Sequence, residues 1–238
     1  MWERKEIAME KPWVMTQEWH DVLFLHWRIA PQLVQPHIPK ELQLDLYEGQ
    51  AWMSIVLFKA KHTRLRLLPP IPIAGTYLEL NVRTYVKYKG KSGVFFFSLD
   101  ADSRLAVKTA SAGNFLPYLH ARMAMVDQGE TYKFKSKRTN RNSFPETLDL
   151  SFRVTSSMPK KSRLEDWLTE RYCLWTKPKK QLFRVDIEHS PWQLFYVKGT
   201  IYKNTMASFL AFSFPQNLAV THYSVKKKVR FFPPVPEY

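Results

Sequence analysis

The strongest constraint on the fold is the alternation of side chains over residues 76–86, TYLELNVRTYV. The even-numbered positions are mainly apolar. The odd-numbered positions are polar or amphipathic, and they are Tyr77, Glu79, Asn81, Arg83 and Tyr85. A period of two predicts a β-strand whose two sets of side chains point to opposite faces. One face is therefore expected in the core, and the other either faces water or lines a polar pocket.

Many other short segments have strand-like patterns with turn-forming residues between them. No low-complexity linker and no internal repeat divides the chain. We therefore predict one β-rich α+β domain over residues 1–238, of barrel or sandwich type. Residues 42–47 and 51–61 are expected to form a hairpin. Further strands are predicted over residues 22–29, 94–100, 123–126, 132–137, 148–154, 182–187, 193–202 and 219–228.

Three short helices are predicted among these strands. Ser103 and Asp102 are the N-cap candidates for the first helix. Ser162 and Glu165 have the spacing of a capping box, which marks the start of the second. The three predicted helices are residues 104–112, 164–171 and 206–212.

Composition and motif content exclude several classes of site. The chain has only 7 glycines and no dinucleotide fingerprint or Walker loop, and its 7 histidines show no HxxxH or HExxH spacing. A single cysteine, Cys173, rules out an internal disulfide and a cysteine-based zinc site, and its bulky neighbours predict that it is buried. We therefore expect no cofactor and no metal. No signal-like N-terminus and no apolar run of ~20 residues occurs, so a cytoplasmic protein without a membrane partner is expected.

The formal net charge of +15 is concentrated in clusters of the second half, at residues 133–141, 160–163, 177–180 and 226–230. Such a chain attracts polyanions, including nucleic acid, without sequence specificity. The alternative is a solvated basic surface. Apolar surface among the many aromatic residues could also mark a homo-oligomer interface, which the sequence does not locate.

Two groups of residues are candidates for chemistry. Glu79 and Arg83 point to the same side of one predicted strand, roughly 13 Å apart along it. Arg83 could hold a ligand carboxylate while Glu79 acts as a base or orienting group. Tyr118 and His120 share a face if they lie on a strand, and they could transfer protons. The alternatives are an outer sheet face with cross-strand pairs and an ordinary hydrogen-bonded histidine.

Several segments resemble the YqjF-like family of uncharacterised bacterial proteins. The start of that family is similar to residues 19–27 (WHDVLFLHW), 37–45 (HIPKELQLD) and 47–52 (YEGQAW). Its central block is similar to residues 77–86 (YLELNVRTYV), 93–101 (GVFFFSLDA), 116–118 (LPY) and 121–123 (ARM). This family is related to acetoacetate decarboxylase, so the resemblance implies a β-rich, cone-like barrel that encloses a pocket.

The resemblance also implies particular site residues. Acetoacetate decarboxylase uses a lysine that directly follows a proline to form a Schiff base with a β-keto acid. The matching segment here is residues 115–119 (FLPYL), which places Tyr118 where the lysine should be. Glu79 matches the family's glutamate in Tyr-x-Glu, and Arg28 matches an arginine of its first strand. A phenol forms no imine, and Lys108 is the nearest lysine in sequence that could replace the missing one.

Three functions follow as alternatives. The first is a pocket that binds a small organic acid or carbonyl compound through Arg28 or Arg83, with Tyr77, Glu79, Asn81, Tyr118 and His120 as further lining residues. The second is a basic protein that binds nucleic acid or another polyanion. The third is a β-keto acid decarboxylase that uses a different lysine. The sequence does not decide between an enzyme and a binding protein.

Overall fold

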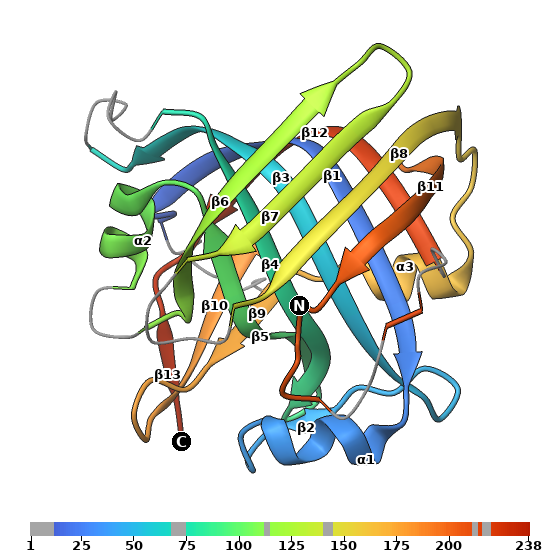
Figure 1. The fold of residues 1–238 in the computed structure, drawn as a ribbon. Coiled ribbons are helices and arrows are strands. Elements are labelled where there is room, and N and C mark those ends of the chain that lie inside the picture. Colours follow the sequence, from blue (N-terminus) through green and yellow to red (C-terminus); the bar gives the residue numbers. More distant parts are fainter. Residues whose placement is uncertain (1–11, 68–74, 112–114, 140–144, 211–213, 216–219) are drawn as a thin grey trace, which may run out of the picture.

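The computed structural model describes residues 12–67, 75–111, 115–139, 145–210, 214–215 and 220–238. The described strands form one 13-stranded sheet in the order β13-β10-β9-β5-β6-β7-β8-β11-β12-β1-β3-β4-β2 (Figure 1). The strands are β1 (Met15–Ile29), β2 (Gln43–Leu44), β3 (Ala51–Leu65), β4 (Tyr77–Tyr88), β5 (Lys91–Ala101), β6 (Tyr118–Asp127), β7 (Tyr132–Arg138), β8 (Thr147–Ser157), β9 (Cys173–Thr176), β10 (Leu182–Glu188), β11 (Phe195–Asn204), β12 (Val220–Phe231) and β13 (Val235–Glu237). The helices are α1 (Pro31–Val34), the 3-10 turn η1 (Gln35–His37), α2 (Arg104–Ala110) and α3 (Arg163–Thr169).

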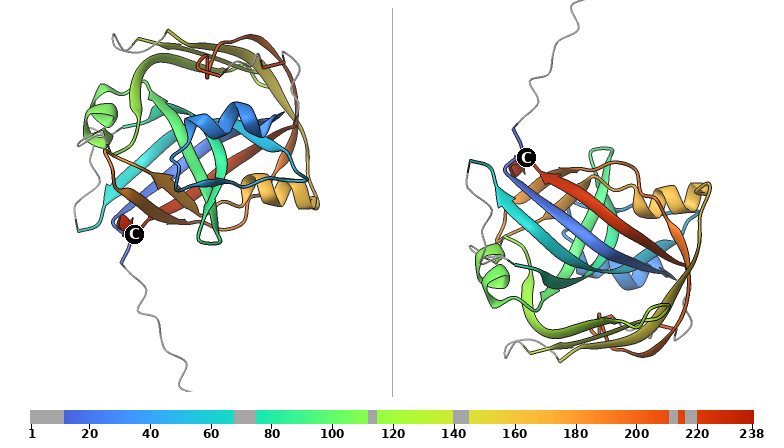
Figure 2. Two further views of the ribbon diagram at one scale, coloured as in Figure 1. Left: turned by 90° about the horizontal axis from the view of Figure 1, so that it is seen from below. Right: turned by 90° about the horizontal axis from the view of Figure 1, so that it is seen from above.

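Two further strand pairings, β5 with β4 and β10 with β12, close the sheet on itself. The larger ring is a closed nine-strand mixed barrel of β12, β1, β3, β4, β5, β6, β7, β8 and β11. The sheet divides at β5, which pairs in parallel with β6 near its end and with β9 near its start. A smaller ring therefore shares β12, β1, β3, β4 and β5, and β9 and β10 complete it. Figure 2 shows β9 and β10 on the opposite side of the molecule from β6, β7 and β8.

Strand β4 belongs to the wall that the two rings share, so both of its faces are buried. Leu80 and Val82 on the even-numbered face lie in the main hydrophobic core, which also contains Phe134 and Leu150 from the far wall of the larger ring. On the odd-numbered face, Glu79 is only 4% exposed. The predicted strand and its alternation are confirmed. The odd-numbered face does not lie against bulk water.

The N-capping residues predicted from the sequence mark the starts of two helices. The Ser103 hydroxyl accepts a hydrogen bond from the Ala106 amide and caps α2. The Ser162 hydroxyl and the Glu165 carboxylate form the predicted capping box at the start of α3. Cys173 is buried, as its neighbours indicate, and burial raises the pKa of its thiol to about 12.

The structure corrects two expectations and adds one strand that the sequence did not indicate. Residues 42–47 do not form a hairpin with β3, because only Gln43–Leu44 is a strand and it pairs with β4. Residues 206–210 form turns and no helix, and the rest of that predicted helix includes residues outside the described part. Strand β9 was missed, because it is four residues long and buried on both sides, which leaves no alternation to detect.

Candidate functional site

A cavity of about 600 Å³ lies within the smaller ring. Most of its lining is apolar, with Phe24, Phe58, Phe96, Trp19 and Trp192 among the large side chains. Residues from β1, β3, β4, β5, β9, β10, α2 and the start of β6 contribute to its walls. A volume of this size and a mainly apolar lining with few polar groups are typical of small-molecule sites.

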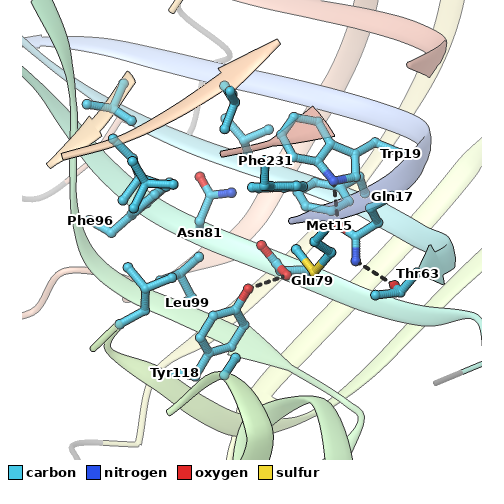
Figure 3. A pocket seen from close by; sticks show the side chains of 18 of the residues that line it. Met15, Gln17, Trp19, Thr63, Glu79, Asn81, Phe96, Leu99, Tyr118 and Phe231 are labelled. Carbon is cyan, nitrogen blue, oxygen red and sulfur yellow. Dashed lines mark hydrogen bonds between the residues drawn. The ribbon is translucent and has the colours of Figure 1, made fainter. Parts of the chain in front are cut away.

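The odd-numbered face of β4 supplies much of the polar lining of this cavity. Tyr77, Glu79, Asn81 and Arg83 all line it, and Tyr118 joins them from β6. Parallel pairing sets Leu99 of β5 opposite Tyr118, and Leu99 also pairs with Asn81 of β4. Five of the seven predicted site residues therefore lie around one cavity. Figure 3 shows Glu79, Asn81 and Tyr118 among them.

Glu79 and Tyr118 form a hydrogen-bonded pair at the cavity wall. The Tyr118 hydroxyl donates to Glu79 Oε2 over 3.0 Å (Figure 3). Burial raises the pKa of Glu79 to about 7, although hydrogen bonds from Tyr118 and Asn81 favour the ionised form. Burial and the neighbouring Glu79 raise the pKa of Tyr118 well above its ordinary value. Tyr118 is therefore a proton-bearing donor, and Glu79 can hold or release a proton close to neutral pH.

Gln17 fixes the neighbouring part of the wall. Its Nε2 atom donates to Tyr77 Oη and to Thr63 Oγ1, each over 2.9 Å. Its Oε1 atom accepts a hydrogen bond of 2.6 Å from Trp19 Nε1. These bonds satisfy Tyr77 and leave the Glu79 carboxyl to interact with Tyr118 and with the cavity. Gln17 and Trp19 lie two residues apart on β1 and therefore share a face. The predicted strand began at residue 22 and did not include them.

Two arginines lie at another part of the cavity lining. Arg83 comes from β4, and Arg171 follows α3. Burial lowers the pKa of the Arg83 guanidinium, and the positive charge of Arg171 contributes in the same direction. Arg83 Nε has no hydrogen-bond partner, and no described carboxylate forms an ion pair with Arg83. The Tyr85 hydroxyl is its polar neighbour and favours its charged form.

Arg171 is held rigidly. Its Nη1 atom lies 2.6 Å from Asp45 Oδ2, and its Nε atom donates to the Trp167 carbonyl oxygen over 2.6 Å. The guanidinium also stacks on the Trp167 ring, 4.4 Å from its centroid. Arg171 Nη2 is nevertheless buried without a partner. Sequence reasoning missed this residue, because an arginine at the end of a short helix carries no recognisable pattern.

Two predicted site residues are placed elsewhere. Arg28 is exposed on β1, where its guanidinium lies over the Trp52 ring at 5.4 Å, and it does not line the cavity. His120 does not line it either, and its Nδ1 atom lies 2.8 Å from Thr139 Oγ1. Lys108 is exposed on α2, and the residues described around the cavity include no lysine.

One group with metal-binding residue types occurs in the described part of the chain, formed by Glu18, His20 and His62. Glu18 Oε2 lies 3.1 Å from His20 Nε2 and 2.9 Å from His62 Nδ1. The ammonium group of Lys226 lies 2.9 Å from the same oxygen. Because a fixed cation already neutralises the only carboxylate of the group, we assign no metal to it.

The basic clusters of the second half are partly neutralised by the chain itself. Lys135 pairs with Asp149, and Lys177 pairs with Glu41. Lys227 is buried, and its ammonium group donates to the Pro191 carbonyl oxygen over 2.8 Å. Polyanion binding therefore stays a prediction from net charge. Within the described residues, no helix has the length and apolar character that crossing a membrane requires.

Comparison with known sequences places the chain in a family. The family described as an uncharacterized conserved protein, DUF2071, matches residues 16–228. The chain belongs to the DUF2071 family. Among DUF2071-like relatives, the uncharacterized protein YqjF of Bacillus subtilis (strain 168) is 41% identical over 223 residues, which cover 93% of this chain and 91% of that protein. The resemblance to YqjF is thereby confirmed.

Solved structures confirm the fold expected for this DUF2071 chain. The enduracididine biosynthesis enzyme MppR, complexed with pyruvate, superposes with a TM-score of 0.66 at 13% identity, over 97% of this chain and 93% of that one. Acetoacetate decarboxylase from Legionella pneumophila gives a TM-score of 0.66 at 12% identity, over 96% and 89% of the two chains. An acetoacetate decarboxylase-like enzyme from Sphingomonas wittichii RW1 gives 0.63 at 14% identity, over 95% and 94%. At these identities the similarity establishes the acetoacetate decarboxylase-like fold alone.

Proposed function

We propose that the cavity binds a small organic acid or carbonyl compound without forming a Schiff base. The observation that carries this proposal is the Tyr118–Glu79 hydrogen bond in a mainly apolar cavity whose described lining contains no lysine. A phenol and a carboxyl group of raised pKa can both donate to a carbonyl oxygen. The pyruvate complex of MppR and the acetoacetate decarboxylases agree with this ligand class.

The pair supports acid–base chemistry without a covalent intermediate. A protonated Glu79 and Tyr118 would polarise a bound carbonyl group, because two donors stabilise negative charge on its oxygen. An ionised Glu79 would instead accept a proton from the carbon next to that carbonyl. With the pKa of Glu79 at about 7, both forms are populated at neutral pH. Tyr118 keeps its proton throughout and positions the ligand.

A binding experiment tests the proposal. Acetoacetate and pyruvate are titrated while tryptophan fluorescence is followed, since Trp19 and Trp192 line the cavity. Tyr118→Phe and Glu79→Gln are each expected to weaken binding by about tenfold. Each variant loses one hydrogen bond to a partly charged acceptor, and such a bond contributes about this factor to affinity. Lys108→Ala is the control and leaves binding unchanged, because Lys108 is exposed outside the cavity.

The absence of imine chemistry is tested on the same samples. Borohydride is added with acetoacetate, and the intact mass is measured. No adduct is expected. A stable adduct that Lys108→Ala removes would establish lysine chemistry and overturn the proposal, as would binding that neither cavity variant alters.

A further inference from the structure

Two sets of polar groups in the cavity come from positions that lie apart along β4. Glu79 and Tyr118 form one set, and Arg83 with Arg171 forms the other. Four residues of β-strand separate Glu79 from Arg83, which corresponds to roughly 13 Å between their backbone positions. A ligand such as acetoacetate or pyruvate is shorter than this backbone separation.

The arginine set has the character of an anion site. Arg171 is 7% exposed, and its Nη2 atom is buried without a partner, although Asp45 already pairs with Nη1. Arg83 Nε also lacks a partner. Two guanidinium groups close enough to affect each other repel, and burying them without a second acceptor is unfavourable. A ligand carboxylate would supply the missing acceptor oxygens, and bidentate pairing with arginine suits its geometry.

The cavity lining around Asn81 is mainly apolar. Phe96 and Leu99 lie beside Asn81 in Figure 3, and Trp19 and Phe231 lie on the other side of it. Asn81 is 4% exposed, and its Oδ1 atom has no partner, so it offers one acceptor part-way along the cavity. Such a lining favours a hydrocarbon chain between the two polar ends.

We infer that the cavity accepts an extended carboxylic acid: a medium-chain acid whose carboxylate lies at Arg83 and Arg171 and whose oxygenated far end reaches Glu79 and Tyr118. This inference rests on the proposed function and narrows its ligand class. It excludes a short keto acid as the best ligand, because such a molecule leaves one polar set unsatisfied.

Displacement of a fluorescent fatty acid from the whole protein tests the inference. The competitors are acetoacetate, levulinate, hexanoate, octanoate, decanoate and ω-hydroxydecanoate. Affinity is expected to rise about three- to fourfold for each added methylene group until the cavity is filled. The hydroxyl group of ω-hydroxydecanoate is expected to give about a further fivefold over decanoate, and Tyr118→Phe removes that gain.

A charge-matched pair separates an anion site from simple apolar burial. Octanoate is expected to bind about tenfold more tightly than octanamide, because only the acid pairs with the guanidinium groups. Arg83→Met removes this preference. Arg28→Met, which changes an exposed arginine outside the cavity, preserves it.

Each result has a distinct meaning. Acetoacetate or levulinate binding as tightly as the longer acids would overturn the inference and leave the proposed function intact. Failure of every competitor would overturn both. Equal affinities for octanoate and octanamide in the unchanged protein would overturn the anion site even if Arg83→Met did not fold.

Discussion

Two regions of this molecule place an arginine in the interior, Arg138 buried and Arg83 partly buried, and they differ in how its charge is satisfied. Arg138 lies between two carboxylates in the sheet. Its Nε and Nη2 atoms donate to Asp100, with distances of 2.8–3.2 Å, and Nη2 also donates to Ser98 over 2.9 Å. Its Nη1 atom lies 2.7 Å from Glu146 Oε2. Every nitrogen of the Arg138 guanidinium has a partner.

Arg83 has no such environment. Its Nε atom lacks a partner, no described carboxylate pairs with it, and a second guanidinium group lies nearby. The first region neutralises its charges within the fold, and the second leaves positive charge facing a cavity. A buried charge that the chain does not pair is the better indication of a ligand, because the fold alone gains nothing from it.

The largest change in the free energy of unfolding is expected around Arg138, whose charge is fully paired. Arg138→Met leaves Asp100 and Glu146 buried without their common partner, so the free energy of unfolding should fall by about 3–5 kcal/mol. Urea denaturation measures this change. Arg122→Met alters an exposed arginine on the neighbouring strand and should change stability by less than about 0.5 kcal/mol. Similar values for the two variants would show that the Arg138 network adds little to the fold.

A change of intermediate size in the free energy of unfolding is expected from the ionisation of Glu79, so it depends on pH. The unfolded chain ionises this carboxyl near its ordinary pKa of 4.5, whereas the folded protein keeps the proton up to about 7. Folding therefore favours the protonated form. The resulting stability is present below about 4.5 and is lost as the pH rises through 7, by about 3 kcal/mol in total.

Glu79→Gln separates this contribution from all other titrations, because glutamine carries no ionisable proton. The difference in unfolding free energy between the unchanged protein and this variant should shift in favour of the variant between pH 4.5 and 7. A difference that is constant over this range would mean that Glu79 is solvated in the folded protein, and the buried pair with Tyr118 would then be wrong.

The strand β4 shows how far local sequence reasoning reaches. Its period of two predicted both the strand and the face that carries Glu79, Asn81 and Arg83. The same alternation could not decide between water and a cavity, because that depends on the strands that close the smaller ring. Those strands, β9 and β10, are distant in sequence, and β9 is too short to show a period.

The lining of the cavity was predictable where its residues shared a strand or a family motif. Tyr118 was found because it occupies the position of a family lysine, and the structure places its hydroxyl on Glu79. Arg28, chosen from a loose match on the first strand, is exposed. Arg171 and Gln17 were missed, since their roles arise from tertiary packing around the cavity.

The smallest change in the free energy of unfolding is expected at Arg83, and this change is an increase. Arg83→Met replaces an incompletely partnered guanidinium with an apolar side chain of similar length, so the free protein should become more stable by about 1–3 kcal/mol. Arg28→Met should have an effect within about 0.5 kcal/mol. Thermal unfolding with and without octanoate completes the test, because the acid should stabilise the unchanged protein more than Arg83→Met, which is expected to bind it about tenfold more weakly. Destabilisation by Arg83→Met would instead mean that Arg83, like Arg138, holds the fold together, and the contrast between the two arginines would disappear.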